Sequence, residues 1–525
     1  MMMLSNARLP RWPVWLLRAG LLLALLAGGS AAPLQAQTPA PPPAAPIAMP
    51  TWTEPIQLST PGQSSWFPDV FADPTGTVHV LWSTTVSTGP GQVYDAVIYR
   101  TSTDGESWTE AIDIAAIATK GAVTRASMLI DPGGIFHLLY RSYTIYYTHA
   151  AVTNVRANVM LPAREISTPD AGYFSRMAMD SQGRLHVIYS ENVYDPSCNG
   201  CFHAFYRYSD DSGVNFSEPV DISRLPTGMA KPQFLIDPDD NLHVVWEVGR
   251  GGDLGQVPEP ATVAYAASYD RGATWTAQYD FVPPDAEGRN IALGRAGDGT
   301  LLVAWLSPVP GADVVYYNTS SDNGRTWSEP QLLPGVWGAW SIYQGKTDTY
   351  MMTTDDLGRV YLFLVGRTAE AQKTLSVLLL VWQDGRWSQP QAIQTYTGDA
   401  PEWPRLSIGN GNQLNLTWFV RNKAAVFASD RGQYTVWYTR GAIDAPAVPT
   451  SVWPSVIAAG EPTATLTPTL PPQLSTPTPT RVAVTPAAPI DFYSEYDYLI
   501  LAAQSILPVI ALIAIAAIIN RVRRG

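Results

Sequence analysis

The sequence predicts an all-β protein: a β-propeller of seven four-stranded blades closed by an N-terminal strand, with one C-terminal transmembrane helix. Three observations lead to this prediction. A turn motif of the form S-x-D-x-G-x-x-W recurs along the chain, a second phrase of the form D-x-x-G precedes its copies, and aromatic residues, which favour strands, make up 11% of the sequence. Six blades are the alternative if a weak copy of the second phrase does not mark a true blade.

The turn motif has the residue types of a tight β-hairpin. Ser and Asp side chains accept hydrogen bonds from the backbone N–H groups of the turn, Gly permits a positive φ angle, and Trp anchors the following strand. We therefore predict a structural role for the motif residues Ser209, Asp211, Gly213, Ser268, Asp270, Gly272, Trp275, Ser320, Asp322, Gly324 and Trp327.

This motif resembles the Asp-box, or bacterial neuraminidase repeat, of the sialidase superfamily, over most of residues 50–445. In that family the motif lies away from the catalytic face, so it indicates a fold before it indicates an activity. The resemblance implies a propeller that acts on or binds extracellular glycans, with exo-sialidase hydrolysis as one possibility. The alternative is a non-catalytic scaffold that binds a protein or a polysaccharide.

The D-x-x-G phrase sets the repeat length. Its clearest copies begin at Asp73, Asp131, Asp180 and Asp237, and a spacing of about 50 to 60 residues suits a four-stranded blade with loops. Residues 52–58 resemble a last blade strand with no blade before it, whereas residues 435–440 resemble a third strand without its fourth. Pairing the two would close the ring and remove the open sheet edges.

Two sets of metal-ligand residue types occur in the repeats. Four His, at positions 79, 137, 186 and 243, occupy one repeat position. Equivalent positions of different blades lie far apart around a ring, so we expect each His to make a contact within its own blade, and we predict no metal and no cofactor. Cys198 and Cys201 are the only cysteines, and in a secreted protein they favour a disulfide.

The chain ends have the composition of targeting segments. Residues 1–36 resemble a cleaved signal peptide, 37–50 a Pro/Ala-rich linker and 446–490 a Thr/Pro-rich stalk. Residues 498–519 carry no charge and are long enough to span a bilayer, and a short basic tail, 520–525, follows. We therefore expect a single-pass cell-membrane protein with the propeller, residues 51–445, outside the cell. The net charge of −12 argues against nucleic acid as a partner.

Basic residues at the start of the inner strands are the first candidates for a ligand site. Arg125, Arg176, Arg289 and Arg405 fall there in different blades. The sialidase resemblance implies a clamp of three Arg on a sugar carboxylate, for which Arg176, Arg289 and Arg405 are candidates. The stretch 66–69 stands where that family has an Arg-Ile-Pro phrase, which leaves catalysis open. The alternative for each Arg is a solvated or ion-paired role in the propeller channel.

Acidic and aromatic residues of the loop face complete the predicted site. Glu191 and Glu247 follow the second strand of their blades and, with Asp69, are candidate catalytic carboxylates for general acid–base chemistry. Trp340 and Trp403 lie in long loops and are candidates for stacking on sugar rings. The alternative for each acid is a solvated loop residue without a catalytic role. The alternative for the two aromatic residues is a contact with another protein or packing within their loop.

Overall fold

A computed structural model describes residues 46–89, 92–117, 124–160, 162–169, 171–195, 198–223, 228–249, 262–282, 286–309, 312–343, 345, 347–422 and 434–453. Contacts divide the chain into two units, Met1–Pro46 and Ile47–Gly525, and the second unit contains the strands described below. The predicted signal peptide, most of the linker and the stalk, the transmembrane helix and the basic tail lie outside the described residues. Within the described ranges, no helix is long and apolar enough to cross a membrane.

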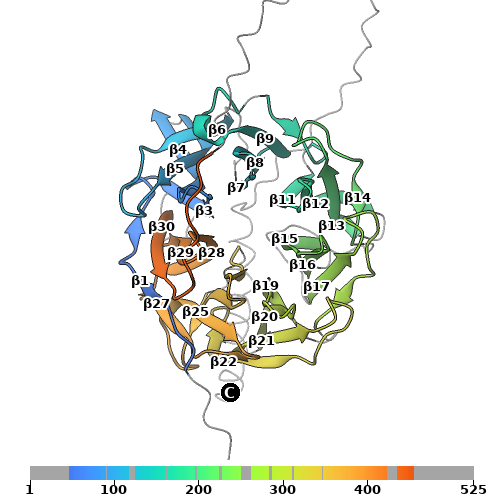
Figure 1. Ribbon diagram of the computed structural model, residues 1–525, viewed down its shortest axis with the longest axis vertical. Helices are drawn as coiled ribbons and strands as arrows, with labels where there is room; N and C mark the ends of the chain where they lie inside the picture. Colours follow the sequence, from blue (N-terminus) through green and yellow to red (C-terminus); the bar gives the residue numbers. More distant parts are fainter. Residues whose placement is uncertain are drawn as a thin grey trace, which may run out of the picture. The chain divides into compact units, whose positions relative to one another are not determined.

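The described strands form antiparallel sheets that stand around a central axis (Figure 1). Four sheets have four strands each, in the order β3-β4-β5-β6, β10-β9-β8-β7, β11-β12-β13-β14 and β15-β16-β17-β18. Their bounds are β3 Ser64–Ala72, β4 Val78–Gly89, β5 Gln92–Ser102, β6 Ile112–Ile117, β7 Thr124–Ile130, β8 Ile135–Arg141, β9 Ile145–Ala151, β10 Arg164–Glu165, β11 Gly172–Met179, β12 Leu185–Asp195, β13 Cys198–Ser209, β14 Val220–Asp221, β15 Gly228–Ile236, β16 Leu242–Gly249, β17 Thr262–Ser268 and β18 Tyr279–Asp280.

A fifth sheet joins the two ends of the propeller. The N-terminal strands β1 (Thr51–Trp52) and β2 (Ile56–Gln57) both pair with β30 (Tyr434–Ala442), which continues into β29 (Gln413–Arg421) and β28 (Ala400–Gly409). The chain thus returns to its starting strand, and the outer edge of β30 is covered by backbone hydrogen bonds.

The sixth sheet has nine strands. It consists of β19 (Arg289–Arg295), β20 (Leu301–Val309), β21 (Ala312–Ser320), β22 (Gln331–Gly338), β23 (Met351–Thr354), β24 (Val360–Arg367), β25 (Leu375–Gln383), β26 (Arg386–Trp387) and β27 (Gln391–Tyr396). The link between its two halves is the pairing of β22 with β24, where Trp337 faces Arg367 and Gly338 faces Gly366.

The predicted blade number is therefore wrong. Five described sheets have the four or five strands of a single blade, and the sixth has nine, so the strands form neither seven nor six separate four-stranded sheets. The physical reason is that β22 continues through Trp337 and Gly338, into the segment expected to be a loop. One edge of β22 still pairs with β21 there, at Val314, and the backbone groups of the other edge pair with β24 instead of ending the sheet. The prediction of an all-β propeller is confirmed, and the predicted number of blades is not.

Apolar side chains fill the spaces between neighbouring sheets. Strand β24, for example, is buried along its whole length, because other strands flank it, the first half of its own sheet packs on one face and the sheet of β28–β30 packs on the other. Trp82, Trp246 and Trp418, which end the predicted second strands, are almost fully buried. These large side chains are therefore part of the core between the sheets.

The innermost strands share a local irregularity that shapes the centre of the ring. The pairing register shifts in β3, β7, β11, β15, β19 and β28, each time near the beginning of the strand. Phe67, Arg125, Lys231, Asn290 and Trp403 lie in these shifts, with φ angles between 50° and 61°. Such bulges redirect side chains, so the bulges determine which groups meet at the axis.

The segment that follows β30 lies on the turns joining first and second strands. Val448 N donates to Asn410 O at 2.8 Å, and Ser451 N donates to Pro74 O at 2.8 Å. Asp444 pairs with Arg359, and the Trp453 ring packs beside Gly134. The first eight residues of the predicted stalk thus contact the propeller.

Candidate functional site

The predicted turn residues satisfy the backbone of their own hairpins. The Ser hydroxyl of each turn accepts a hydrogen bond from the Gly N–H, and the Asp carboxylate accepts one from the N–H four residues further on. The distances are 2.8 Å for Ser209–Gly213, 2.8 Å for Ser268–Gly272 and 2.9 Å for Ser320–Gly324, and 2.8 Å for Asp211–Asn215, Asp270–Thr274 and Asp322–Thr326. These hydrogen bonds give the Ser and Asp side chains of the turns a structural use.

The same turns also hold neighbouring sheets together. A Cβ atom added at Gly272 would lie 2.1 Å from the Tyr206 hydroxyl, and one at Gly324 would lie 1.8 Å from the Tyr265 hydroxyl. Trp275 and Trp327 pack edge-on against these same two tyrosines. Each Gly is therefore needed both for its positive φ and for the close approach of a tyrosine from the preceding sheet.

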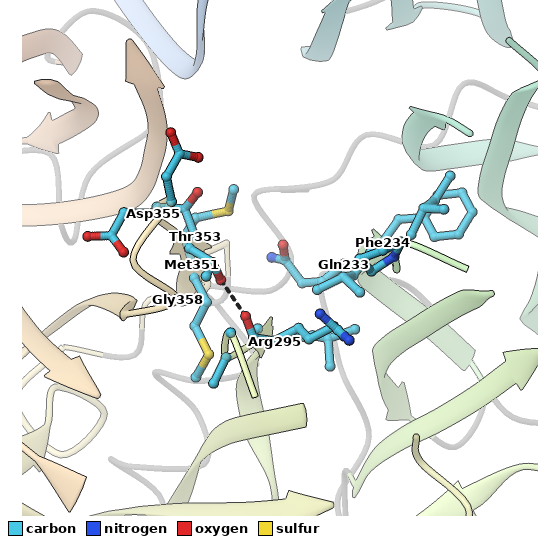
Figure 2. Close-up of a pocket in the computed structure, with 17 residues that line it drawn as sticks. Gln233, Phe234, Arg295, Met351, Thr353, Asp355 and Gly358 are labelled. Atoms are coloured by element: carbon cyan, nitrogen blue, oxygen red, sulfur yellow. Dashed lines mark hydrogen bonds between the residues drawn. The ribbon is translucent and has the colours of Figure 1, made fainter. Parts of the chain in front are cut away.

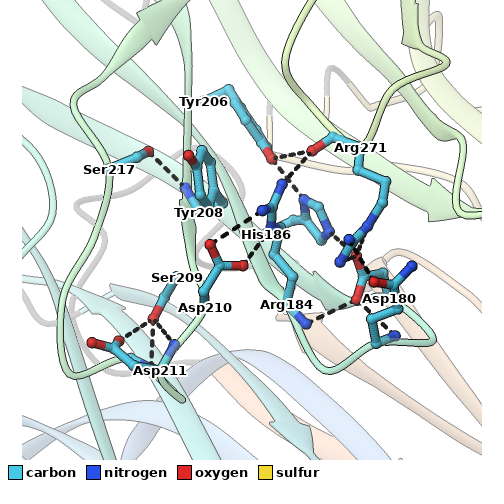
Figure 3. A network of polar contacts seen from close by, with 12 residues as sticks. Asp180, Arg184, His186, Tyr206, Tyr208, Ser209, Asp210, Asp211, Ser217 and Arg271 are labelled. Carbon is cyan, nitrogen blue, oxygen red and sulfur yellow. Dashed lines mark hydrogen bonds and ion pairs between the residues drawn. The ribbon is translucent and has the colours of Figure 1, made fainter.

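The four repeated histidines form contacts within their own sheets, as predicted. In the sheet shown in Figure 3, His186 Nδ1 lies 2.7 Å from the Tyr206 hydroxyl and Nε2 lies 3.2 Å from Asp180 of the D-x-x-G turn. The other three sets repeat this order: Asp73–His79–Tyr99, Asp131–His137–Tyr147 and Asp237–His243–Tyr265. Burial lowers the pKa of His186 to about 4, so the imidazole is neutral at neutral pH. The described residues include no cluster of three or more metal-ligating side chains.

Two of the three candidate catalytic acids are buried and bridge neighbouring sheets. Glu247 is 1% exposed, lies 2.7 Å from Lys231 Nζ and accepts a hydrogen bond from Asn290 N at 2.5 Å. Asp69 accepts a hydrogen bond from Met128 N at 3.0 Å and lies 3.7 Å from Arg176. These contacts give both carboxylates a structural use.

The third acid, Glu191, is separate from them. Its carboxylate is half-buried and accepts a hydrogen bond from Thr168 N at 3.1 Å. Among the described residues, no hydrogen bond or ion pair joins Glu191 to Glu247 or to Asp69. Paired-carboxylate hydrolysis would require two such groups to flank one bond.

The candidate substrate-binding arginines separate into two places. Arg125, Arg176 and Arg405 line one small void near the axis, together with Lys231. Arg289 lies elsewhere, ion-paired with Glu287 and stacked 4.2 Å from the Trp340 ring centre. The structure therefore brings together two of the three expected clamp residues, Arg176 and Arg405, and not the third.

The two candidate aromatics are engaged inside the protein. Trp403 is 4% exposed and packs against Phe67 and Phe174, with the Arg405 guanidinium 3.9 Å from its ring centre. Trp340 is partly buried against a core cluster. Cys198 and Cys201 belong to the backbone of β13, and the predicted disulfide lies outside the described side chains.

Sequence reasoning missed a buried group at the centre, Asp348. Its carboxylate accepts hydrogen bonds from Trp403 N at 2.9 Å and Asn290 Nδ2 at 3.1 Å, and its backbone carbonyl accepts one from Lys231 Nζ at 2.6 Å. Burial raises the pKa of Asp348 to about 8. Asp348 lies in an irregular segment between β22 and β23, where no repeat marks it.

A tyrosine–glutamate pair lies beside this centre. The Tyr343 hydroxyl donates to Glu402 at 2.7 Å, and Glu402 also accepts hydrogen bonds from Thr347 at 2.5 Å and from Arg421 at 3.1 Å. Glu402 is completely buried. Burial, and next the charge of Glu402, raise the pKa of Tyr343 far above that of an ordinary phenol.

The larger described cavity, of about 440 Å³, is at another position. Three inner strands surround it, β15, β19 and β23, near the turns that lead to their second strands. Figure 2 shows Gln233 and Phe234 on one side, Thr353, Met351 and Asp355 opposite, and Arg295 near the base. The site predicted from the sequence lies on the other face, at the starts of the inner strands and in the loops of that face, whereas this cavity lies toward the ends of the inner strands.

The cavity lining combines apolar and polar groups. Met351 and Leu293 contribute apolar surface, while Gln233, Arg295 and Asp356 contribute polar side chains. Arg295 Nε is buried and has no hydrogen-bond acceptor among the described residues. A mostly pre-formed hollow with a few polar groups is the ordinary form of a small-molecule site.

Comparisons with known proteins give structural neighbours only. No protein-family model and no curated relative matches the sequence. Similar solved structures include an ulvan lyase bound to a glucuronate–sulfated rhamnose unit, with 10% identity, 71% coverage of this chain, 93% of that chain and a TM-score of 0.46. They also include the NanB sialidase of Streptococcus pneumoniae, with 13% identity and a TM-score of 0.40; the match covers 73% of this chain and 71% of that chain. An α-L-arabinanase of Penicillium chrysogenum in complex with arabinobiose has 12% identity and a TM-score of 0.40; the match covers 74% of this chain and 98% of that chain. These neighbours are glycan-active enzymes, but likenesses this distant do not assign an activity to this chain.

Proposed function

We propose that the protein is a membrane-anchored, outward-facing propeller that binds glycans without hydrolysing them. The observation that carries this proposal is the cavity of about 440 Å³ between β15, β19 and β23. Its volume suits a mono- or disaccharide, and its lining offers both apolar surface and hydrogen-bonding side chains. The Asp-box resemblance and the predicted membrane span support glycans at the cell surface as the ligand class.

The state of the predicted catalytic groups favours binding over hydrolysis. Asp69 and Glu247 use their carboxylates to hold neighbouring strands, and Glu247 is nearly inaccessible. A general acid or base must reach the bond that it protonates or the water that it activates. These two side chains lie in the interior, so they are poorly placed for that role.

The test is binding of the full-length protein, purified in a non-glycosidic detergent, to a glycan array. We expect binding that Arg295→Gln weakens at least tenfold, because the substitution removes the guanidinium next to the cavity. Arg325→Gln is the matched control, since Arg325 is exposed on a turn away from the cavity. Equal binding by the wild type and Arg295→Gln would remove the cavity from the proposal.

A second candidate function, exo-sialidase hydrolysis, is favoured by one contact, the hydrogen bond between Tyr343 and Glu402. The sialidase resemblance implies a Tyr nucleophile activated by Glu. The raised pKa of Tyr343 opposes that role, because a nucleophile needs a lowered one. Release of fluorophore from a sialoside, abolished by Tyr343→Phe, would establish hydrolysis and displace the binding proposal; we expect no release.

A further inference from the structure

A small void at the centre of the ring is surrounded by positive charge. Its volume is about 10 Å³, the space of roughly one water molecule. Four lining side chains are cationic, those of Arg125, Arg176, Lys231 and Arg405, and no carboxylate lines it. It shares no lining residue with the larger cavity, so what it binds is independent of the proposed glycan site.

Three donors around this void lack an acceptor. Arg405 Nε, Arg176 Nη2 and the Ser175 hydroxyl are buried atoms without a hydrogen-bond partner among the described residues. Arg405 is 1% exposed and Ser175 is 6% exposed. Buried donors of this kind are rare, because leaving even one unsatisfied costs about 1–3 kcal/mol. Three in residues around one void point to an acceptor that occupies it.

The charges of these residues decide what kind of acceptor fits. Lys231 forms an ion pair with Glu247, and Arg176 Nη1 lies 3.7 Å from the Asp69 carboxylate. Arg405 has no ion pair in the described part of the chain; its guanidinium donates to the Pro404 carbonyl and stacks on Trp403. Burial and next the neighbouring Arg176 lower the pKa of Arg405, while the charges of Asp69 and Asp348 raise it and offset only part of that effect. A neutral water would accept the hydrogen bonds but would add no negative charge to offset the rest of the Arg405 charge.

We propose that the void binds one small monovalent anion, such as chloride, between Arg176, Arg405 and Ser175. The anion accepts the unpartnered donors and compensates the buried charge of Arg405. It also joins β11 to β28, which belong to different sheets, so it acts as a structural ion at the axis. A sugar carboxylate is too large for this void, which separates the ion from any substrate.

The test measures stability against halide concentration. Full-length protein prepared in sodium gluconate is titrated with sodium chloride or bromide at constant ionic strength, and its Tm is followed by thermal unfolding. We expect a saturable rise of a few degrees with either halide, because a ligand that binds only the folded state stabilises it. Bromide should give an anomalous scattering peak at the void in crystals.

The matched variants are Ser175→Ala and Ser127→Ala. Both remove a buried hydroxyl without a partner from an inner strand, but only Ser175 lines the void. We expect Ser175→Ala to shift the halide midpoint to at least threefold higher concentration and Ser127→Ala to leave it unchanged. A Tm that responds equally to gluconate and chloride, or a void that contains water in bromide-soaked crystals, would overturn the proposal.

Discussion

Polar side chains in the turns at one face of the propeller and in the inner strands at its axis differ in where their hydrogen-bond and ion-pair partners lie. In the turns, each Ser, Asp and His has a partner within a few residues or on the adjacent strand, and contacts to the next sheet, such as Arg271 with Asp180, add to these local ones. At the axis, Lys231, Glu247 and Asp348 each have a partner on another sheet, and Arg405 forms no ion pair within the described ranges. Repetition therefore indicates scaffold, and the non-repeated charges indicate where binding chemistry can reside.

The strongest test of this difference is the loss of one charge at the axis. Lys231→Met leaves Glu247 buried without its partner, and we expect it to destabilise the protein by about 3–5 kcal/mol. Chemical unfolding measures the effect. The double variant Lys231→Met/Glu247→Gln removes both charges and should recover much of the loss; failure to recover would mean that Lys231 stabilises by packing instead of by pairing.

A methyl group at a turn tests the scaffold directly. Gly272→Ala places a Cβ atom against the Tyr206 hydroxyl at a residue with φ of 91°, and we expect a loss of about 2–4 kcal/mol from steric overlap and the unfavourable φ. Gly183→Ala is the control, because Gly183 has a φ of 83° and no atom within 4 Å of the added Cβ. Similar losses for the two variants would assign the whole effect to φ.

The His contacts predict a pH dependence. The pKa of His186 is about 4 in the folded protein against about 6.5 for an exposed histidine, so the unfolded chain binds the proton more readily. The stabilisation is complete above pH 6.5 and is lost as the pH falls from 6.5 to 4, up to about 3 kcal/mol. Unfolding curves of the wild type and His186→Asn across this range measure it. Parallel curves for the two proteins would contradict the assignment to His186.

The smallest expected effect is the loss of one turn hydrogen bond. Ser268→Ala removes the hydroxyl that accepts from Gly272 N and donates to Asp270, and we expect a loss of about 1–2 kcal/mol. Ser64→Ala removes a buried hydroxyl with no partner among the described residues and should change stability less. Equal Tm values for Ser268→Ala and wild type would show that water replaces the Ser268 hydroxyl.

The repeated turns were predictable because their interactions are local. The sequence order S-x-D-x-G-x-x-W places the hydroxyl, the carboxylate and the glycine of one hairpin in contact, whatever surrounds them. The repeated His likewise reaches its Asp six residues away, as His186 and Asp180 do. The blade number was not predictable in this way, because the pairing of Trp337 with Arg367 depends on how two distant strands meet.

By itself the sequence determined the all-β propeller and the residues that close its hairpins, since those contacts span only a few residues. The tertiary structure decided which charges meet. Arg176 and Arg405 are 229 positions apart in the sequence, and the curvature of the ring brings them to one void while leaving Arg289 with Glu287. The cavity and the buried partners of Asp348 depend on the same closure. The physical reason is that an axis exists only once the sheets have joined, so no local pattern can encode what lies on it.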